Sequence, residues 1–157
     1  MSAAKSKQSK IFTIGYEQAK SDAVLRELTA AKVDILVDVR AVAASRRPGF
    51  SKRQLAASLN EHGIAYLHLR ALGTPKEGRL AARGGNMDEL FRIFEAHLKT
   101  PPAQEELDEL ATLVQSGRRV CLLCYERDVV QCHRSRLAEL TCERTRAAVE
   151  HLIPPLF

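Results

Sequence analysis

The chain has 157 residues, of which 45% are hydrophobic and 27% are charged, and its formal net charge is +5. These proportions are typical of one globular domain and speak against intrinsic disorder and a coiled coil. The apolar runs are far shorter than the roughly 20 residues of a membrane span, so we expect a cytoplasmic protein that does not contact a membrane. We also expect a disordered tail over residues 1–10 and a single domain over residues 11–157.

Five short apolar runs predict strands. β-branched and aromatic residues dominate the first run, and the second is almost continuously apolar, which indicates burial on both faces as in a parallel sheet. In chain order, the predicted strands are residues 11–15, 35–39, 64–69, 120–124 and 147–153.

Capping signals predict the helices between these strands. Ser51 and Gln54 have the spacing of a capping box, as do Asn86 and Glu89, and Ser21 is placed to cap the first helix. The predicted helices span residues 21–31, 51–62, 86–99, 101–116 and 132–142, and a glycine follows the second and the fourth.

Residues 72–85 are rich in Gly, Arg and Lys, and we expect them to form a loop. The alternation of strands and helices elsewhere predicts an α/β fold, a single three-layer domain with a mainly parallel sheet of about five strands flanked by helices. In such a sheet, ligands bind beyond the carboxyl ends of the strands, where the loops gather. The functional site is therefore expected at that edge.

Basic residues are concentrated in one part of the chain. Residues 38–84 contain nine Lys and Arg against three acids, a local balance of +6, whereas residues 85–117 have a balance of −5. Arg outnumbers Lys 16 to 8, and Arg is the better bidentate partner for phosphate or carboxylate. This pattern indicates a face that binds anions.

The segment that begins at the end of the fourth predicted strand carries the densest group of reactive side chains. Residues 124–136 contain two thiols, one imidazole, three guanidinium groups and two carboxylates in 13 positions. If the last long helix begins at Cys132 or His133, the Cys132 thiol faces unpaired N–H groups and the positive end of the helix dipole, which lower a thiol pKa. Cys124 ends a buried strand, and Cys121 points to the opposite face and belongs to the core. All four cysteines of the chain lie between residues 121 and 142, so we expect no disulfide framework.

Six motifs stand in order along the chain: TIGY at 13–16, LVDVR at 36–40, SRRPGFSK at 45–52, LG at 72–73, LLCYE at 122–126 and CHR at 132–134. With these motifs, nearly the whole chain after Lys10 resembles the domain of unknown function 488 family. The resemblance implies a compact α/β domain and supplies no established reaction. The functional positions that it implies are Arg40, Arg46, Cys124, Glu126, Cys132, His133 and Arg134.

Our leading hypothesis is an enzyme with a cysteine-centred site that acts, without a cofactor, on an anionic, phosphate-bearing substrate such as a nucleotide or nucleic acid. Cys124 or Cys132 would be the nucleophile of a thiol-dependent hydrolase or transferase, and Glu126 and His133 would complete the catalytic group. The side chains expected to bind the anionic substrate are Tyr16, Asp38, Arg40, Ser45, Arg46, Arg47 and Arg134.

A second hypothesis is a nucleic-acid-binding module without chemistry, in which Tyr16, Phe50 and Tyr66 stack on bases. A weaker likeness, at the level of the fold, is to rhodanese sulfurtransferases and cysteine phosphatases, but the chain lacks their compact Cys-x5-Arg loop.

A third hypothesis is a metal-binding protein in which Cys124, Cys132 and His133 bind zinc. Against it, Cys132 and His133 are adjacent at the start of a helix, so we do not expect both to face one ion, and no fourth ligand is obvious.

Overall fold

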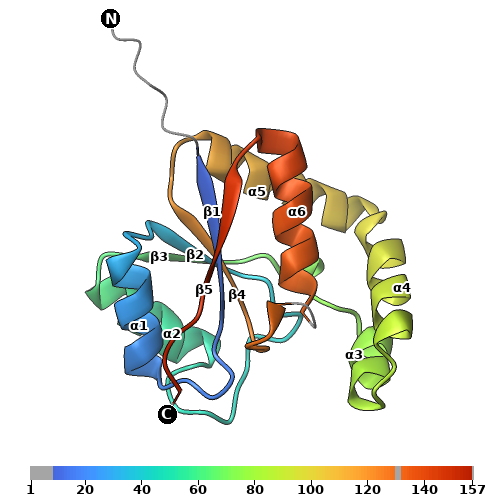
Figure 1. Ribbon diagram of the computed structural model, residues 1–157, viewed down its shortest axis with the longest axis horizontal. Coiled ribbons are helices and arrows are strands. Elements are labelled where there is room, and N and C mark those ends of the chain that lie inside the picture. The colour runs from blue at the N-terminus through green and yellow to red at the C-terminus, as the bar shows by residue number, and fades with distance from the viewer. Residues whose placement is uncertain (1–8, 130–131, 157) are drawn as a thin grey trace, which may run out of the picture.

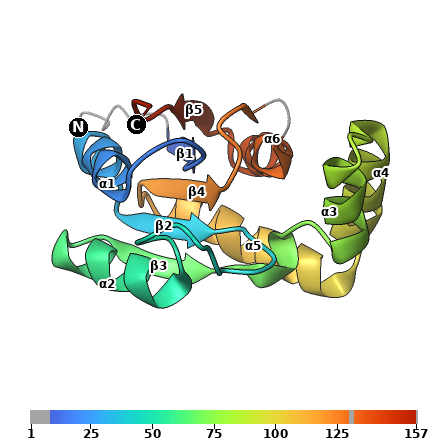
Figure 2. The same cartoon turned by 90° about the horizontal axis from the view of Figure 1, so that it is seen from below.

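In the computed structural model of the protein, one parallel sheet lies between two layers of helices (Figure 1 and Figure 2). The structure describes residues 9–129 and 132–156. The tail expected over residues 1–10 therefore lies almost entirely outside the described residues, and the first strand begins at Lys10. Within the described part of the chain, no helix combines the length and the apolar character that a membrane crossing requires.

The sheet is entirely parallel, which confirms the predicted fold class. Its strands are β1 (Lys10–Gly15), β2 (Ile35–Asp38), β3 (Ala65–His68), β4 (Val120–Cys124) and β5 (Ala148–Leu152). They lie in the order β3-β2-β4-β1-β5. The register places Gly15 beside Cys124 and Asp38 beside Leu123. The strand ends therefore meet at one side of the sheet, here termed the carboxyl edge.

Helices cover both faces of this sheet. They are α1 (Ser21–Ala30), α2 (Lys52–Glu61), α3 (Lys76–Arg83), α4 (Met87–Leu98), α5 (Pro101–Gln115) and α6 (His133–Thr145), with a short 3-10 turn at Arg70–Leu72. Helices α1 and α2 lie on one face, and α5 and α6 lie on the other (Figure 2). Helices α3 and α4 form a pair beyond α5 and α6, farther from the sheet (Figure 2).

Alternating side chains of each strand enter two separate hydrophobic cores. Val37 belongs to the core on the side of α5 and α6, and Leu36 to the core on the side of α1 and α2. Cys124 lies in the first core and Cys121 in the second, as the strand alternation predicts. Of these two cysteines of β4, Cys124 therefore lies on the face that α6 covers.

The segment 72–85 contains helix α3, so the prediction of a loop there is wrong. Ala, Leu, Lys, Arg and Glu, which are good helix formers, make up almost all of this helix. Gly78 allows a close approach to α4, because a Cβ at this position would lie 2.6 Å from Thr74 Cγ2 and 3.3 Å from Leu90 Cδ1. A glycine that suggests a loop in the sequence thus serves helix packing.

The predicted capping residues stand at or beside the helix starts, but only Asn86 acts as predicted. Its side chain accepts a hydrogen bond from the Glu89 N–H at 3.1 Å. Ser51 precedes α2, but its hydroxyl bonds to the backbone N–H and carbonyl of Ser45 instead of to the helix. Ser21 is the first residue of α1 and not its cap. Ser51 therefore fixes the loop before α2.

Candidate functional site

The loops after β2 and β4 meet the beginning of α6 at the carboxyl edge. Cys124 is the last residue of β4, Cys132 precedes α6, and His133 is the first residue of α6. All three side chains are buried, with at most 7% of each exposed. These three residues are termed the thiol-imidazole cluster.

The ligand atoms of the thiol-imidazole cluster lie within 4.8 Å of one another. Nδ1 of His133 is 3.5 Å from the Cys124 sulfur and 3.9 Å from the Cys132 sulfur. Cys132 has an extended backbone, with φ −121° and ψ 138°, whereas His133 is helical, so their side chains leave the chain in different directions and still converge. The expectation that these adjacent residues would not face one point is wrong.

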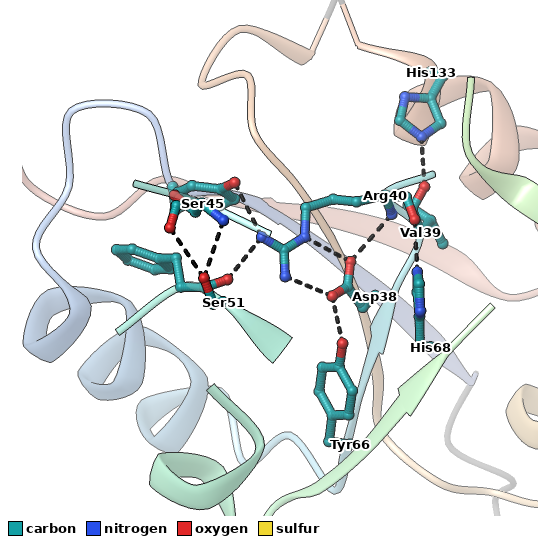
Figure 3. Close-up of polar contacts among 10 residues, drawn as sticks. Asp38, Val39, Arg40, Ser45, Ser51, Tyr66, His68 and His133 are labelled. Carbon is teal, nitrogen blue, oxygen red and sulfur yellow. Dashed lines mark hydrogen bonds and ion pairs between the residues drawn. The ribbon is translucent and has the colours of Figure 1, made fainter. Parts of the chain in front are cut away.

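A hydrogen bond on the far side of the ring fixes the orientation of His133. Its Nε2 lies 2.9 Å from the carbonyl oxygen of Val39, directly after β2 (Figure 3). A carbonyl oxygen only accepts, so Nε2 carries a proton, and in the neutral ring Nδ1 carries none. The ring of Phe94 packs edge-on against the imidazole, with 5.2 Å between the ring centroids.

Helix α6 begins at His133, and Cys132 caps it. Its sulfur accepts a hydrogen bond from the Arg134 N–H at 3.5 Å. Burial alone would raise the pKa of this thiol, but the hydrogen bond from Cys124 and the charges of His133 and Arg134 hold the pKa well below its ordinary value. Burial and the hydrogen bond to Cys132 raise the pKa of Cys124 well above its ordinary value. The site therefore stabilises a thiolate at Cys132.

Glu126 lies beside the thiol-imidazole cluster, on the loop after β4. Its Oε2 accepts a hydrogen bond from the Cys124 thiol at 3.3 Å. Burial, together with the negative charge of Cys132, raises the pKa of the Glu126 carboxyl group. The carboxylate does not lie within 4.8 Å of all three ligand atoms of Cys124, Cys132 and His133. It therefore adjoins the cluster at Cys124 without entering its centre.

Arg134 fixes the loop that carries Glu126. The side chain is fully buried, and its guanidinium donates from NH1 to the Glu126 carbonyl and from NH2 to the Arg127 carbonyl. Gly15 leaves room for this loop, because a Cβ at Gly15 would overlap with the Glu126 carbonyl. Arg134 thus supports the fold at the site, and its role in binding an anion stays a prediction.

Asp38 and Arg40 form a buried ion pair close to the same edge (Figure 3). Arg40 donates from Nε to Oδ1 of Asp38 at 2.9 Å and from NH2 to Oδ2 at 2.7 Å. Its NH1 donates to the Tyr16 hydroxyl at 3.1 Å and to the Phe50 carbonyl at 2.8 Å. The Tyr66 hydroxyl donates to Asp38 at 2.6 Å. Arg40 and Asp38 therefore hold the loop after β2 in place, and a contact of either residue with a substrate stays a prediction.

The family model described as Domain of unknown function DUF488 matches residues 20–141, more than three quarters of the chain. This chain belongs to the DUF488 family. No curated protein and no solved structure matches it. The matched residues include the whole thiol-imidazole cluster and Glu126, whereas β1 and β5 lie outside them. Membership confirms the resemblance of the motifs and assigns no reaction.

Three more of the residues expected to bind an anion contact other residues of the DUF488 domain. Tyr16 is buried and stacks on Phe50, with 4.4 Å between the ring centroids. Arg47 donates to the carbonyls of Tyr16 and Ala19, and its guanidinium lies 5.0 Å from the centroid of Phe50. The Ser45 hydroxyl accepts from the Arg47 N–H at 3.1 Å. Both rings are buried, and base stacking by Tyr16 and Phe50 stays an untested prediction.

A comparison of Arg46 with Arg47 tests whether Arg47 stabilises the fold of the DUF488 domain. Arg46 is exposed, so Arg46→Ala is expected to change the free energy of unfolding by no more than about 0.5 kcal/mol. Arg47→Ala removes two hydrogen bonds from a charged group and is expected to lower that free energy by about 1.5–3 kcal/mol. Urea denaturation of both variants measures the difference, and equal midpoints would show that Arg47 is not part of the fold.

Sequence reasoning missed three contributors to the site of this DUF488 protein. Val39 acts through its backbone carbonyl, for which a sequence holds no side-chain signal. Phe94 lies in the hydrophobic core and also packs on His133. Tyr66 was considered only for base stacking, but its hydroxyl bonds to Asp38. The signal available for Tyr66 was its hydroxyl group, which lies on a strand next to the buried Asp38 carboxylate.

Proposed function

We propose that this protein binds one zinc ion through Cys124, Cys132 and His133 and that the ion is its functional centre. The observation that carries the proposal is the spacing of the ligand atoms. With a Zn–S bond of about 2.3 Å and a Zn–N bond of about 2.05 Å at a tetrahedral angle, a sulfur and a nitrogen ligand lie about 3.6 Å apart. The two separations between His133 Nδ1 and the sulfurs, 3.5 and 3.9 Å, lie on either side of this value.

The contacts around the thiol-imidazole cluster support the same assignment. A histidine that binds a metal through one nitrogen usually donates its other N–H to a carbonyl or carboxylate, which fixes the ring. His133 makes this bond to the Val39 carbonyl, and its Nδ1 lies 3.5 Å from the Cys124 sulfur and 3.9 Å from the Cys132 sulfur. The Arg134 N–H donates to the Cys132 sulfur, which favours the thiolate that a metal requires.

Burial favours a metal ligand over the nucleophile that the sequence suggested. Cys124 is 4% exposed and Cys132 is 1% exposed. A nucleophilic cysteine has to be reached by its substrate, and reactive cysteines accordingly lie in partly exposed surroundings. We therefore reassign both thiols from nucleophiles to ligands, and a zinc ion replaces the expectation that the protein needs no cofactor.

The donor set supports zinc among the common biological ions. Thiolate and imidazole are ligands of zinc in both structural and catalytic sites. Magnesium and calcium prefer oxygen ligands, which the thiol-imidazole cluster does not offer. The arrangement of a strand end and a helix start around the ligands also holds them in place before the ion binds.

Elemental analysis of the purified full chain tests the proposal. We expect about one zinc ion per chain in the wild-type protein and little or none in Cys132→Ser, because a hydroxyl is a poor zinc ligand. Cys142→Ser is the matched control, since this cysteine lies on the same helix, outside the thiol-imidazole cluster, and should keep the full zinc content.

Two results would contradict the zinc site. One is wild-type protein that contains no zinc and takes up none on dialysis against it, and the other is equal zinc content in Cys132→Ser and Cys142→Ser. Rapid alkylation of Cys132 in such metal-free protein would then return this thiol to the role of nucleophile.

A further inference from the structure

We infer that the protein binds a chain of phosphate groups in a pocket at the amino ends of strands β1 and β4. The pocket has a volume of about 610 Å³. Pockets that hold small molecules usually have volumes of about 300–1,000 Å³. The thiol-imidazole cluster lies at the opposite edge of the sheet, so binding in this pocket does not depend on the proposed zinc ion.

Three segments that are distant in the sequence form this pocket. β1 begins at Lys10, Lys32 follows the end of α1, and Arg118 and Arg119 connect α5 to β4. All four of these cationic residues line the pocket, which is here termed the basic pocket. Among the residues that the structure describes, no acidic residue lines it. The four cations also lie outside residues 38–84, where the sequence indicates a face that binds anions.

Two contacts hold the guanidinium group of Arg119 in place. Its Nε donates to the Ala31 carbonyl at 3.0 Å, and its central carbon lies 4.9 Å from the centroid of the Phe12 ring. In the described part of the chain, neither terminal nitrogen of this guanidinium has an acceptor. Asp34 accepts a hydrogen bond from the backbone N–H of Arg119 and does not line the pocket. Arg119 therefore keeps two fixed donors for the oxygens of a phosphate group.

The other three cations of the basic pocket are also able to contact an anion. Lys32 and Arg118 are exposed, and neither side chain makes a hydrogen bond or an ion pair with another described residue. Lys10 pairs with Glu150 at 3.3 Å, but the two side chains are 46% and 51% exposed. An exposed pair of this kind contributes little to stability, so Lys10 can exchange Glu150 for a bound anion.

The helix ends at the basic pocket do not account for its cations. The carboxyl end of a helix carries a partial negative charge and attracts cations. Ala31 at the end of α1 and Gly117 after α5 both line the pocket. Arg119 bonds to the end of α1, but the side chains of Lys32 and Arg118 bond to neither helix end within the described residues. These two cations are therefore available to a ligand.

The composition of the basic pocket indicates the class of ligand. Four cations without an acid attract an anion that carries several charges, and guanidinium and ammonium groups both bind phosphate. No aromatic residue lines the pocket in the described part of the chain, and the Phe12 ring is 1% exposed. A base has no ring on which to stack there. The ligand is therefore recognised by its phosphate groups, whether they belong to a nucleotide or to an inorganic polyphosphate.

Titration calorimetry of the full chain with inorganic tripolyphosphate and with ATP tests the basic pocket. We expect both to bind, with dissociation constants within about threefold of each other, because the base is not recognised. The double variant Lys32→Gly, Arg118→Gln is expected to weaken both by about tenfold or more, because bonds between charged groups are lost. Lys32 has a φ of 56°, which glycine adopts readily, and Arg118 is exposed, so this variant should keep the urea midpoint of the wild type.

The double variant Lys52→Gln, Arg53→Gln is the matched control. It also removes one lysine and one arginine, from the exposed start of α2, and should bind both ligands as the wild type does. Equal weakening in the two double variants would show attraction by the net charge and not by the pocket. Wild-type protein that binds neither ligand, or ATP that tripolyphosphate does not displace, would exclude recognition through the phosphate chain. Each of these results would overturn the inference.

Discussion

Arg40→Ala is expected to lower the free energy of unfolding by about 3–5 kcal/mol, because it leaves the Asp38 carboxylate buried without its ionic partner. The side chains of Asp38 and Arg40 are 0% and 6% exposed. The variant also loses the bonds of Arg40 to the Tyr16 hydroxyl and the Phe50 carbonyl. Urea denaturation measures the loss, which is a large fraction of the stability of an ordinary domain.

Two further variants show whether the unpaired charge is the cause. Asp38→Asn in the Arg40→Ala background removes the buried charge and is expected to recover part of the lost stability. Arg46→Ala, an exposed arginine on the following loop, should leave the denaturation midpoint unchanged. A loss of less than about 1 kcal/mol in Arg40→Ala would show that the pair does not stabilise the loop after β2.

Removal of the metal is expected to lower the midpoint of thermal unfolding by about 10 °C. An ion that binds only the folded protein stabilises it by about 4 kcal/mol when its free concentration is 1,000 times the dissociation constant. For a domain of this size, 1 kcal/mol corresponds to roughly 2–4 °C. Scanning calorimetry before and after treatment with a strong chelator measures the shift, and added zinc should reverse it.

Cysteine variants separate this effect from other actions of the chelator. Cys142→Ser should respond to the chelator as the wild type does, because Cys142 lies outside the thiol-imidazole cluster. Cys132→Ser should unfold at the same temperature with and without the chelator. A wild-type midpoint that does not move after the metal has been removed would contradict a tightly bound ion.

The strands and the layer architecture could be predicted from the sequence because burial controls both. The second and fourth strands are almost continuously apolar, as the centre of a parallel sheet requires, and β2 and β4 are neighbours there. Helix α3 was missed because Gly78 indicates a loop by composition, and only its contacts with Thr74 and Leu90 show why a helix needs it. Composition alone does not reveal which neighbour a glycine will meet.

The candidate site was predictable in its location and less so in its chemistry. Cys124 and Cys132 were expected near each other because a strand end and a helix start meet at the carboxyl edge. Their relation to His133 depends on the extended backbone of Cys132, which a sequence does not display. The sequence shows the positive charge of Arg40 close to the carboxylate of Asp38, but not that the two side chains share two hydrogen bonds.

X-ray absorption at the zinc edge of the purified full-length protein is the most direct test of the zinc site. The proposed site predicts two sulfur neighbours at about 2.3 Å and one imidazole nitrogen at about 2.0–2.1 Å. Cys124→Ser should lose one of the two sulfur neighbours if any metal remains bound. A zinc ion surrounded only by oxygen and nitrogen, or wild-type protein that binds no zinc, would contradict the assignment of Cys124, Cys132 and His133 as metal ligands.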